Sequence, residues 1–294
     1  MLILISDAFD PGLPEKLSRY GEVTDDKGRA PEAEVVLVRS KTKVTKEYID
    51  AAPNLKLVIR GGVGLDNVDV AYAEEKWIAV FNTAEASSIA VAELTFALMI
   101  ALPNHLPAAD RSMQEGKWLK KELGRTELYG KTLGILGVGN IGVELAQRAL
   151  AFGMRVVGYN PRSRNKPHVE MQNSMKEVLN VSDYVSLNLP LSDETRGVIN
   201  RETLAEFKDG AYLINAGRGK TVVEADVVEA LKSGKLAGFA TDVWYSDPPE
   251  RNPFVGIPNV IMTPHLGAST NENLLRIGEV VDRLIGEYVA SKRK

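Results

Sequence analysis

A glycine-rich turn between an apolar run and a helical pattern is the feature that most restricts the fold of this 294-residue chain. The apolar run is Leu133–Leu136, and Gly137–Gly142 follows it with the spacing G-x-G-x-x-G. A helical pattern then extends from Asn140 to Phe152, and Arg155–Tyr159 is again apolar. This order predicts a strand, a crossover helix and a second, parallel strand.

The residues of this turn suit the binding of a dinucleotide. Gly137 permits the tight turn, Gly139 lets a pyrophosphate approach the backbone, and Gly142 lets the helix pack closely on the strand. The free N–H groups at the start of the helix, including those of Asn140 and Ile141, would face the phosphates. The sequence therefore predicts a Rossmann-type site for NAD or NADP.

The second strand ends without the acidic residue that usually holds the ribose 2′-hydroxyl of NAD. Asn160 takes that place, and Arg162 and Arg164 follow in the next loop. An amide can bond a hydroxyl but does not repel a 2′-phosphate, and a guanidinium can pair with that phosphate. We therefore expect NADP to be at least tolerated. The alternative is that both arginines are ordinary loop charges.

Apolar runs and helical patterns alternate through most of the chain, which is typical of α/β proteins with parallel sheets. The runs in the first part of the chain are Leu2–Ile5, Val35–Val38, Leu57–Ile59 and Ile78–Phe81. A second series of alternating apolar runs and helical patterns begins near residue 131. The sequence therefore predicts two doubly wound parallel-sheet units, Rossmann-like or flavodoxin-like.

Composition and charge exclude several other classes of protein. The net charge is −3, so there is no basic surplus that would hold nucleic acid or an anionic membrane. The chain has no cysteine, which excludes disulfides, thiolate catalysis and cysteine-ligated metals, and we expect no metal site. The most apolar stretch, Ala84–Leu102, contains two Glu and two Ser and predicts a buried helix rather than a membrane span. Since Met1–Asp7 lacks a basic leader, we expect a cytoplasmic protein.

Three further post-strand loops carry groups suited to acid–base and carboxylate chemistry. Arg218 lies between two glycines, where a guanidinium can grip a carboxylate with two bonds. Asp242 and Asp247 follow another apolar run, and His265 follows the next one. Because ligands bind at the carboxyl edge of a parallel sheet, His265 is the predicted acid–base group.

Several long motifs, in the same order, resemble those of the D-isomer-specific 2-hydroxyacid dehydrogenase family over nearly the whole chain. The motifs are Val38–Thr45, Arg60–Asn67, Gly116–Trp118, Glu127–Thr132, Gly137–Gly142, Asn215–Gly219 and Pro264–Thr270. The chain is most similar to the phosphoglycerate dehydrogenase branch of the family, in a short form that we expect to lack a C-terminal regulatory domain.

This resemblance implies roles for the residues at the strand ends. Arg218 would bind the substrate carboxylate and the carbonyl oxygen, and His265 would be the acid–base residue. Asp247 stands where the family usually has Glu, so the carboxylate partner of the histidine is kept with one methylene fewer. Asp242 matches a position near the nicotinamide carboxamide.

The resemblance also implies a substrate site in the first part of the chain. The loop Gly61, Gly62, Val63 and Gly64 matches a backbone cradle for the substrate carboxylate. Arg39 and Arg60 match phosphoglycerate-type positions and favour a phosphorylated substrate.

The family fold implies a substrate domain of residues 1–100 with 271–294, a dinucleotide-binding domain of residues 101–270, and a cleft between them. From its pattern alone, the polar stretch Pro103–Gly130 is either a surface excursion or an arm that packs on a second subunit. In the family, residues 84–130 correspond to the segment that builds a homodimer, so we expect a homodimer.

The expected activity is hydride transfer between NAD(P) and a D-2-hydroxyacid, foremost D-3-phosphoglycerate and 3-phosphohydroxypyruvate of serine biosynthesis. The alternative within the family is a glyoxylate or hydroxypyruvate reductase. A third interpretation, a dinucleotide-sensing binding protein similar to the C-terminal-binding corepressors, is disfavoured because Arg218 and His265 together suit turnover.

Overall fold

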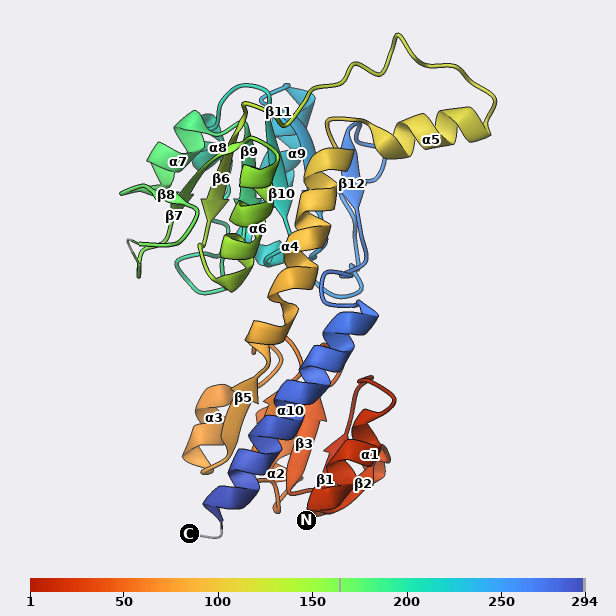
Figure 1. Ribbon diagram of the computed structural model, residues 1–294, viewed down its shortest axis with the longest axis vertical. Helices are drawn as coiled ribbons and strands as arrows, with labels where there is room; N and C mark the ends of the chain where they lie inside the picture. The colour runs from red at the N-terminus through yellow and green to blue at the C-terminus, as the bar shows by residue number, and fades with distance from the viewer. Residues whose placement is uncertain (164, 293–294) are drawn as a thin grey trace. The chain divides into compact units, whose positions relative to one another are not determined.

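The chain forms two compact units in the computed structural model, which describes residues 1–163 and 165–292 (Figure 1). Met1–Ser88 and Ala268–Lys294 make up the first unit, and Ile89–Gly267 makes up the second. Each unit contains one sheet whose strand pairs are all parallel, which confirms the predicted α/β class with two doubly wound units.

The boundary between the units lies at Ser88, whereas the sequence led us to expect it near residue 100. The reason is the helix α4 (Ala84–Ala101), which begins in the first unit and continues into the second. Its later residues, among them Phe96 and Met99, are buried in the core of the second unit. A single unbroken helix therefore belongs to both units.

The sheet of the first unit has the strand order β2-β1-β3-β4-β5. Its strands are β1 (Leu2–Ile5), β2 (Glu22–Thr24), β3 (Val35–Val38), β4 (Leu57–Arg60) and β5 (Ala79–Asn82). The helices are α1 (Leu13–Leu17), α2 (Lys46–Asp50), α3 (Val70–Glu75) and α10 (Asn271–Ser291), with 3-10 turns η1 (Ser18–Tyr20) and η2 (Lys27–Glu32). This is the flavodoxin-like order, in which the chain changes direction between β1 and β3.

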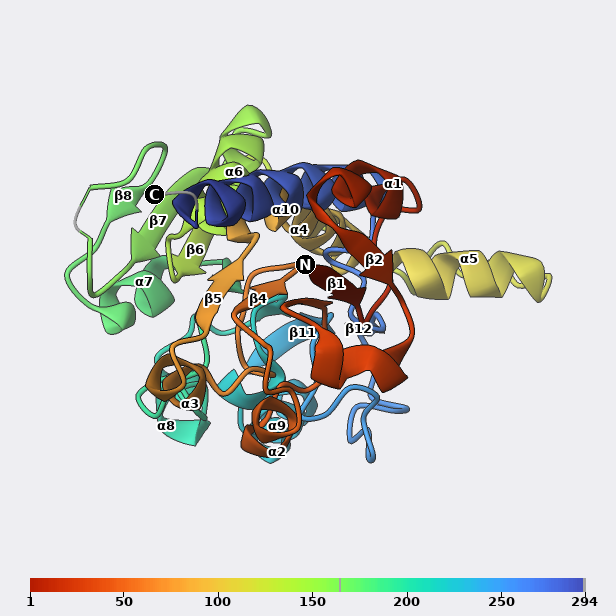
Figure 2. The ribbon, with the colours of Figure 1, turned by 90° about the horizontal axis from the view of Figure 1, so that it is seen from below.

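Alternation along the strands divides the core of this unit into two layers. Leu4 and Val36 point to the face that α2 and α3 cover, while Ile3 and Val35 point to the opposite face. The helices α1 and α10 cover that second face and lie side by side (Figure 2). Both faces of the inner strands β1, β3 and β4 are therefore buried, which is why these three strands are almost continuously apolar.

The sheet of the second unit has the order β12-β11-β10-β9-β6-β7-β8. Its strands are β6 (Thr132–Leu136), β7 (Arg155–Tyr159), β8 (Glu170–Met171), β9 (Tyr184–Leu187), β10 (Ala211–Asn215), β11 (Leu236–Thr241) and β12 (Val260–Met262). After α4, the helices are α5 (Leu106–Gln114), α6 (Asn140–Ala151), α7 (Met175–Val181), α8 (Arg201–Ala205) and α9 (Glu224–Lys232), with the 3-10 turn η3 (Gly219–Thr221). The chain winds outward from β6 in one direction and from β9 in the other.

Helices cover both faces of this second sheet. Residues of α4 and α6 pack on one face, and residues of α7, α8 and α9 pack on the other. The helix α4 is apolar enough and long enough to cross a membrane, with a mean hydropathy of 1.5, but 56% of it is buried inside the protein. It is therefore placed as a core helix, as the sequence predicts.

Candidate active site

The carboxyl edge of the second sheet brings together the loops that carry most of the predicted site residues. These loops follow β6, β7, β10, β11 and β12. The strands β6 and β9 are neighbours from which the chain winds in opposite directions, and such a switch point is where open α/β sheets bind their ligands.

The glycine turn after β6 has room for a phosphate-bearing ligand. Gly137 has φ +90°, and a Cβ there would lie 2.6 Å from the carbonyl oxygen of Asn188, so this close approach requires glycine. Gly139 is the N-cap of α6, makes no side-chain cap, and has no atom within 4 Å of the place a Cβ would take. The open side of Gly139 at a helix N-terminus suits the pyrophosphate of a dinucleotide.

Asn188 is a further candidate that the sequence analysis missed. It follows β9, and its Nδ2 donates to Ser186 Oγ at 3.2 Å. Its Oδ1 is buried and has no hydrogen-bond partner in the described part of the chain. A ligand hydroxyl or amide beside Gly137 would satisfy this acceptor. The sequence feature that could have identified Asn188 is its position as a polar residue directly after a buried strand.

Asn160 ties the glycine turn to the loop after β7. Its Nδ2 donates to the carbonyl of Val138 at 3.2 Å, and its Oδ1 accepts from the N–H of Arg162 at 3.0 Å. The side chain of Arg162 is exposed. Arg164 lies outside the described residues. No carboxylate occupies the position where a 2′-phosphate would be repelled.

Arg218 lies in a loop that neighbouring backbone holds tightly. Its carbonyl oxygen accepts from Asn215 Nδ2 at 3.0 Å and from Thr221 Oγ1 at 2.7 Å. A Cβ on Gly219 would collide with the backbone of Trp244, so this neighbour of the arginine must be glycine. The position of Arg218 at the sheet edge is therefore determined by its surroundings.

His265 and Asp247 form a direct pair. Nδ1 of His265 lies 2.5 Å from Oδ2 of Asp247, so the shorter carboxylate side chain reaches the imidazole. This leaves Nε2 as the ring nitrogen that can face a substrate. His265 has φ +56°, in the left-handed region that few residues other than glycine adopt. Such backbone conformations cluster at functional sites.

Asp242 holds the loop that carries His265. One carboxylate oxygen accepts from Thr263 Oγ1 and from the N–H of Leu266, both at 2.7 Å. The other accepts from the N–H of Gly267 at 2.8 Å. Since Asp242 is only 2% exposed, these bonds account for its carboxylate. The resemblance placed it near the nicotinamide, and the structure adds an anchoring contact to the histidine loop.

The first unit carries the predicted substrate groups at the carboxyl edge of its own sheet. The loop Gly61–Gly64 follows β4, but two of its four N–H groups are taken up inside the fold. Gly61 donates to the carbonyl of Val38 and Gly62 donates to Thr83 Oγ1, each at 2.8 Å. Within residues 1–163 and 165–292, the N–H groups of Val63 and Gly64 have no partner. Of the predicted anion-binding loop, Val63 and Gly64 are therefore the two residues whose N–H groups remain available to an anion.

Arg39 follows β3, and its guanidinium is half-buried. Its Nη atoms donate to the carbonyls of Ala8 and Ala268 at 3.4 and 3.1 Å, and its Nε is buried without a partner in the described chain. Burial lowers the pKa of Arg39, against the opposing effect of the charge on Asp7. Arg60 lies at the end of the neighbouring strand β4, and its guanidinium packs over Gly62. The two arginines thus share one sheet edge.

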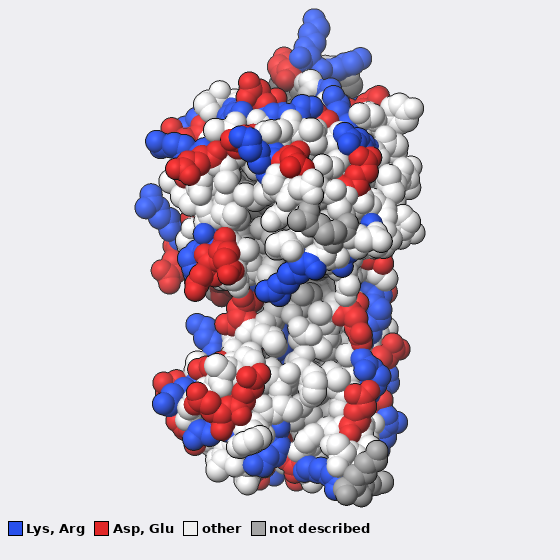
Figure 3. All heavy atoms as spheres, turned by 90° about the vertical axis from the view of Figure 1, so that its left-hand side faces the viewer, with Lys and Arg blue, Asp and Glu red and all other residues white. Residues whose placement is uncertain are grey.

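Charges of both signs are interspersed on the face of the molecule that Figure 3 shows. Within the described residues, no cluster of three or more His, Cys, Asp or Glu side chains could hold a metal ion.

Comparison with known proteins identifies the class. The NAD binding domain model of the D-isomer specific 2-hydroxyacid dehydrogenases matches residues 96–267, and the chain belongs to this family. It is therefore an NAD-binding oxidoreductase whose family acts on the CH–OH group of 2-hydroxyacids. This confirms the predicted family and enzyme class.

Two relatives show how similar the chain is to characterised members of the family. Hydroxypyruvate reductase of Thermotoga maritima is 45% identical over 265 residues, which cover 87% of this chain and 85% of that protein. D-3-phosphoglycerate dehydrogenase of Methanocaldococcus jannaschii is 41% identical over 291 residues, covering 95% of this chain and 56% of that protein. The chain thus spans about half the length of the phosphoglycerate dehydrogenases it matches.

A solved structure supports the same fold. An acyclic imino acid reductase in complex with NADPH and D-Arg superimposes with a TM-score of 0.92 at 28% identity, covering 99% of this chain and 98% of that one.

Proposed function

We propose that this chain interconverts D-3-phosphoglycerate and 3-phosphohydroxypyruvate, as an enzyme of serine biosynthesis in the cytoplasm. The observation that supports it is the environment of Arg39. Among the described residues no carboxylate forms a direct ion pair with this half-buried guanidinium, the charge of Asp7 acts on it only without direct contact, and its Nε has no partner. A buried cation is costly without an anion, and a substrate phosphate would supply one. Arg60 adds a second guanidinium at the same sheet edge.

The groups at the carboxyl edge of the second sheet suit the chemistry of hydride and proton transfer. A nicotinamide dinucleotide bound at the glycine turn Gly137–Gly142 would provide the acceptor for the hydride of C2. His265 takes the proton of the 2-hydroxyl at Nε2, because Nδ1 is occupied by Asp247. The carboxylate of Asp247 stabilises the imidazolium that forms. Arg218 binds the substrate carboxylate and stabilises negative charge on the developing carbonyl oxygen. In the reverse direction, His265 returns the proton.

The experiment that tests this proposal compares substrates with and without a phosphate. Purified protein is assayed with 3-phosphohydroxypyruvate, hydroxypyruvate and glyoxylate by following the absorbance of the reduced nicotinamide. We expect the highest kcat/KM with the phosphorylated substrate. Arg39→Ala and Arg60→Ala should each lower that value by about tenfold or more and leave hydroxypyruvate little affected, because a charge-assisted hydrogen bond is lost. Equal effects on both substrates would refute phosphate recognition.

Reduction of unphosphorylated hydroxypyruvate or glyoxylate is the second candidate. It is favoured by the 45% identity with the hydroxypyruvate reductase of Thermotoga maritima, a relative of similar length. A higher kcat/KM for hydroxypyruvate in the same assay would establish it. Absence of turnover with all three substrates, together with tight dinucleotide binding, would instead favour the corepressor-like binding protein.

The environment of Asn160 supports use of NADP as well as NAD. Its amide occupies the strand end without a negative charge, and Arg162 is exposed in the following loop. The related imino acid reductase was solved with NADPH.

The segment of residues 84–130 supports the proposal of a homodimer. The helix α5 and the segment after it project away from the sheet of the second unit (Figure 1). Large apolar side chains are exposed along them, namely Leu106, Met113, Trp118 and Tyr129. Exposed apolar surface of this kind marks an interaction site, and a second copy of the chain would cover it.

A further inference from the structure

Asp7 lies at the switch point of the first sheet and has no role in the chemistry proposed so far. It follows β1, and Arg39 follows the neighbouring strand β3. The chain passes from β1 to β2 on one side and returns to β3 on the other. The crevice outside the carboxyl ends of two such strands is where doubly wound sheets bind ligands.

Within the described residues, the hydrogen bonds of the Asp7 carboxylate all go to one loop, residues 39–42, and Lys27 Nζ lies 3.9 Å from its Oδ1. Oδ2 accepts from the N–H of Arg39 at 2.6 Å and from the N–H of Thr42 at 3.1 Å, and Oδ1 accepts from Thr42 Oγ1 at 2.7 Å. The side chain is only 3% exposed. Burial alone would raise the pKa of Asp7, but these hydrogen bonds outweigh burial and hold the pKa below its usual value. The carboxylate is therefore ionised at neutral pH.

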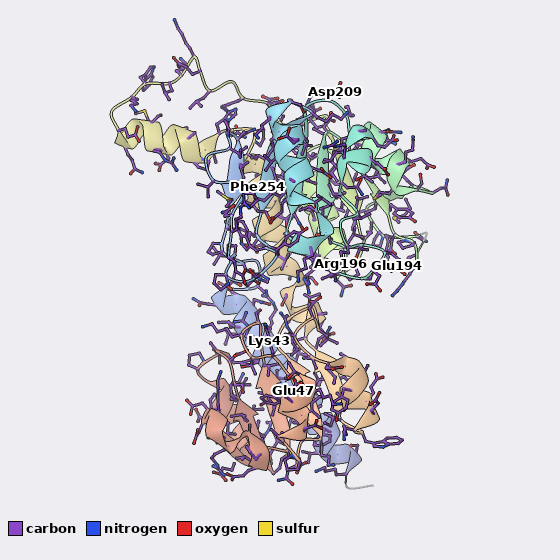
Figure 4. All side chains as sticks on the ribbon, turned by 180° about the vertical axis from the view of Figure 1, so that it is seen from behind. Lys43, Glu47, Glu194, Arg196, Asp209 and Phe254 are labelled. Atoms are coloured by element: carbon purple, nitrogen blue, oxygen red, sulfur yellow. The ribbon has the colours of Figure 1, made fainter. Side chains whose placement is uncertain are left out.

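Asn67 holds the same loop through its carbonyl groups. Its Nδ2 donates to the carbonyl of Arg39 at 2.7 Å and to the carbonyl of Thr42 at 2.6 Å. The N–H groups at both ends of the loop thus bind Asp7, and the carbonyls of the same two residues bind Asn67. We call this set of hydrogen bonds to residues 39–42 the clamp. Lys43, labelled in Figure 4, follows this clamped loop and leads into α2.

We propose that Asp7 and Asn67 are positioning residues for recognition of the substrate phosphate, a role that rests on the proposed function. They hold the backbone of residues 39–42 so that the guanidinium of Arg39 is in place before the phosphate arrives. Neither needs to touch the substrate. An anionic Asp7 would repel a phosphate, so its contribution is to the geometry of the loop, where ordering in advance lowers the cost of binding.

Two substitutions of Asp7 distinguish the effect of its hydrogen bonds to the loop from the effect of its negative charge. In Asp7→Asn, the amide oxygen can accept from the two backbone N–H groups, while Nδ2 donates to the hydroxyl oxygen of Thr42. The clamp is therefore kept and the charge is lost. In Asp7→Ala the clamp is lost. We expect Asp7→Ala to raise KM for 3-phosphohydroxypyruvate by about tenfold, with KM for hydroxypyruvate and both kcat values changed by less than about twofold. Asp7→Asn should restore most of the loss.

Asn67→Ala provides an independent second variant, which decides the matter if Asp7→Ala does not fold. It removes the clamp from the carbonyl side and should raise KM for the phosphorylated substrate selectively, as Asp7→Ala does. Asp183→Ala is the matched control, because Asp183 is also a carboxylate that accepts a backbone N–H, from Thr132 at 2.8 Å, but lies in the second unit. It should leave the ratio of the two KM values unchanged. Dinucleotide affinity, measured by fluorescence titration, should match the wild type in the Asp7 and Asn67 variants.

The outcomes separate this proposal from the one on which it rests. Arg39→Ala without any loss of phosphate selectivity overturns the proposed substrate, and the positioning role with it. If Arg39→Ala is selective but Asp7→Ala and Asn67→Ala affect both substrates equally or not at all, only the positioning role is overturned. An Asp7→Asn variant as defective as Asp7→Ala also overturns it, because charge rather than the hydrogen-bonded clamp would then matter.

Discussion

At the scale of single residues, the left-handed backbone conformation of His265 determines which substitution can test its role as the acid–base group. With φ +56°, this position tolerates Asn better than Ala, because Asn adopts the left-handed region more readily. His265→Asn should therefore keep the fold and the affinity for the dinucleotide. Turnover should fall by about 10²-fold or more, because the group that accepts and returns the proton is lost.

Steady-state assays together with dinucleotide titration would check this expectation. His168→Asn is a matched control, since His168 also has a positive φ, +67°, but is exposed and makes no pair with a carboxylate among the described residues. It should behave as the wild type. Near-normal turnover in His265→Asn would show that another group transfers the proton.

Asn160 allows a second prediction at this scale, on the choice between NAD and NADP. Asn160→Asp should shift the ratio of kcat/KM values toward NAD, because a carboxylate bonds the ribose 2′-hydroxyl and repels a 2′-phosphate. We expect the wild type to accept NADP at a measurable rate. Discrimination of several hundredfold against NADP by the wild type would contradict our interpretation of Asn160. Arg162→Ala should lower kcat/KM with NADP and leave NAD unaffected.

At the scale of elements, a carboxylate at the start of β9 connects two strands of the second sheet. Asp183 accepts from the N–H of Thr132 on β6 at 2.8 Å and pairs with Lys208 at 2.5 Å. Burial alone would raise the pKa of Asp183, but the hydrogen bonds from Lys208 and Thr132 outweigh it and lower the pKa. A carboxyl group whose pKa is lower in the folded state stabilises the fold above its unfolded value, about 3.9, and this stabilisation is lost as the pH falls through the folded value.

Asp183→Asn should therefore lower the free energy of unfolding at pH 7, and its difference from the wild type should shrink below about pH 4. Urea unfolding followed by circular dichroism at both pH values would measure this. Asp209→Asn is the control, since Asp209 (Figure 4) also pairs with a lysine, Lys235, but its side chain is 91% exposed. An equal loss of stability in both variants at every pH would contradict the stabilising role that we assign to the ionised carboxylate of Asp183.

The short edge strands show the limit of pattern analysis for elements. The sequence predicted the long apolar strands, but it missed β2 and β8. These strands are short and lie at sheet edges, and the residues Glu22–Thr24 and Glu170–Met171 are partly or fully exposed. An edge strand can form without an apolar run, because its pairing depends on the neighbouring strand rather than on its own burial.

At the scale of the whole molecule, the exposed apolar side chains of residues 106–129 predict self-association. Leu106→Asp together with Met113→Asp should convert a dimer into a monomer, because a charge at the centre of an apolar interface costs more than the contact supplies. Light scattering after size-exclusion chromatography would report the mass. Val255→Asp is the control, since Val255 is 70% exposed outside this segment. A monomeric wild type at micromolar concentration would refute the dimer.

The sequence by itself determined the α/β class, the longer apolar strands and the dinucleotide-binding family. Local rules suffice for these, because apolar periodicity selects strands and helices, and the G-x-G-x-x-G spacing restricts a turn to backbone conformations that glycine adopts. Arg218, His265 and Asp247 were recognisable as polar groups directly after buried strands. Parallel strands bring such groups to one edge of a sheet, whatever the remaining contacts are.

Only the tertiary structure decided which groups are already occupied and by which partners. The carboxylate of Asp242 binds the loop of His265, Asp7 binds a loop that begins 32 residues away, and the N–H groups of Gly61 and Gly62 are used inside the fold. These contacts join segments that only the winding of the sheets brings together, so no local pattern encodes them. A polar group that is already hydrogen-bonded inside the fold is not available to a ligand. Whether a side chain or a backbone N–H can bind a ligand therefore depends on neighbours that are distant in the chain.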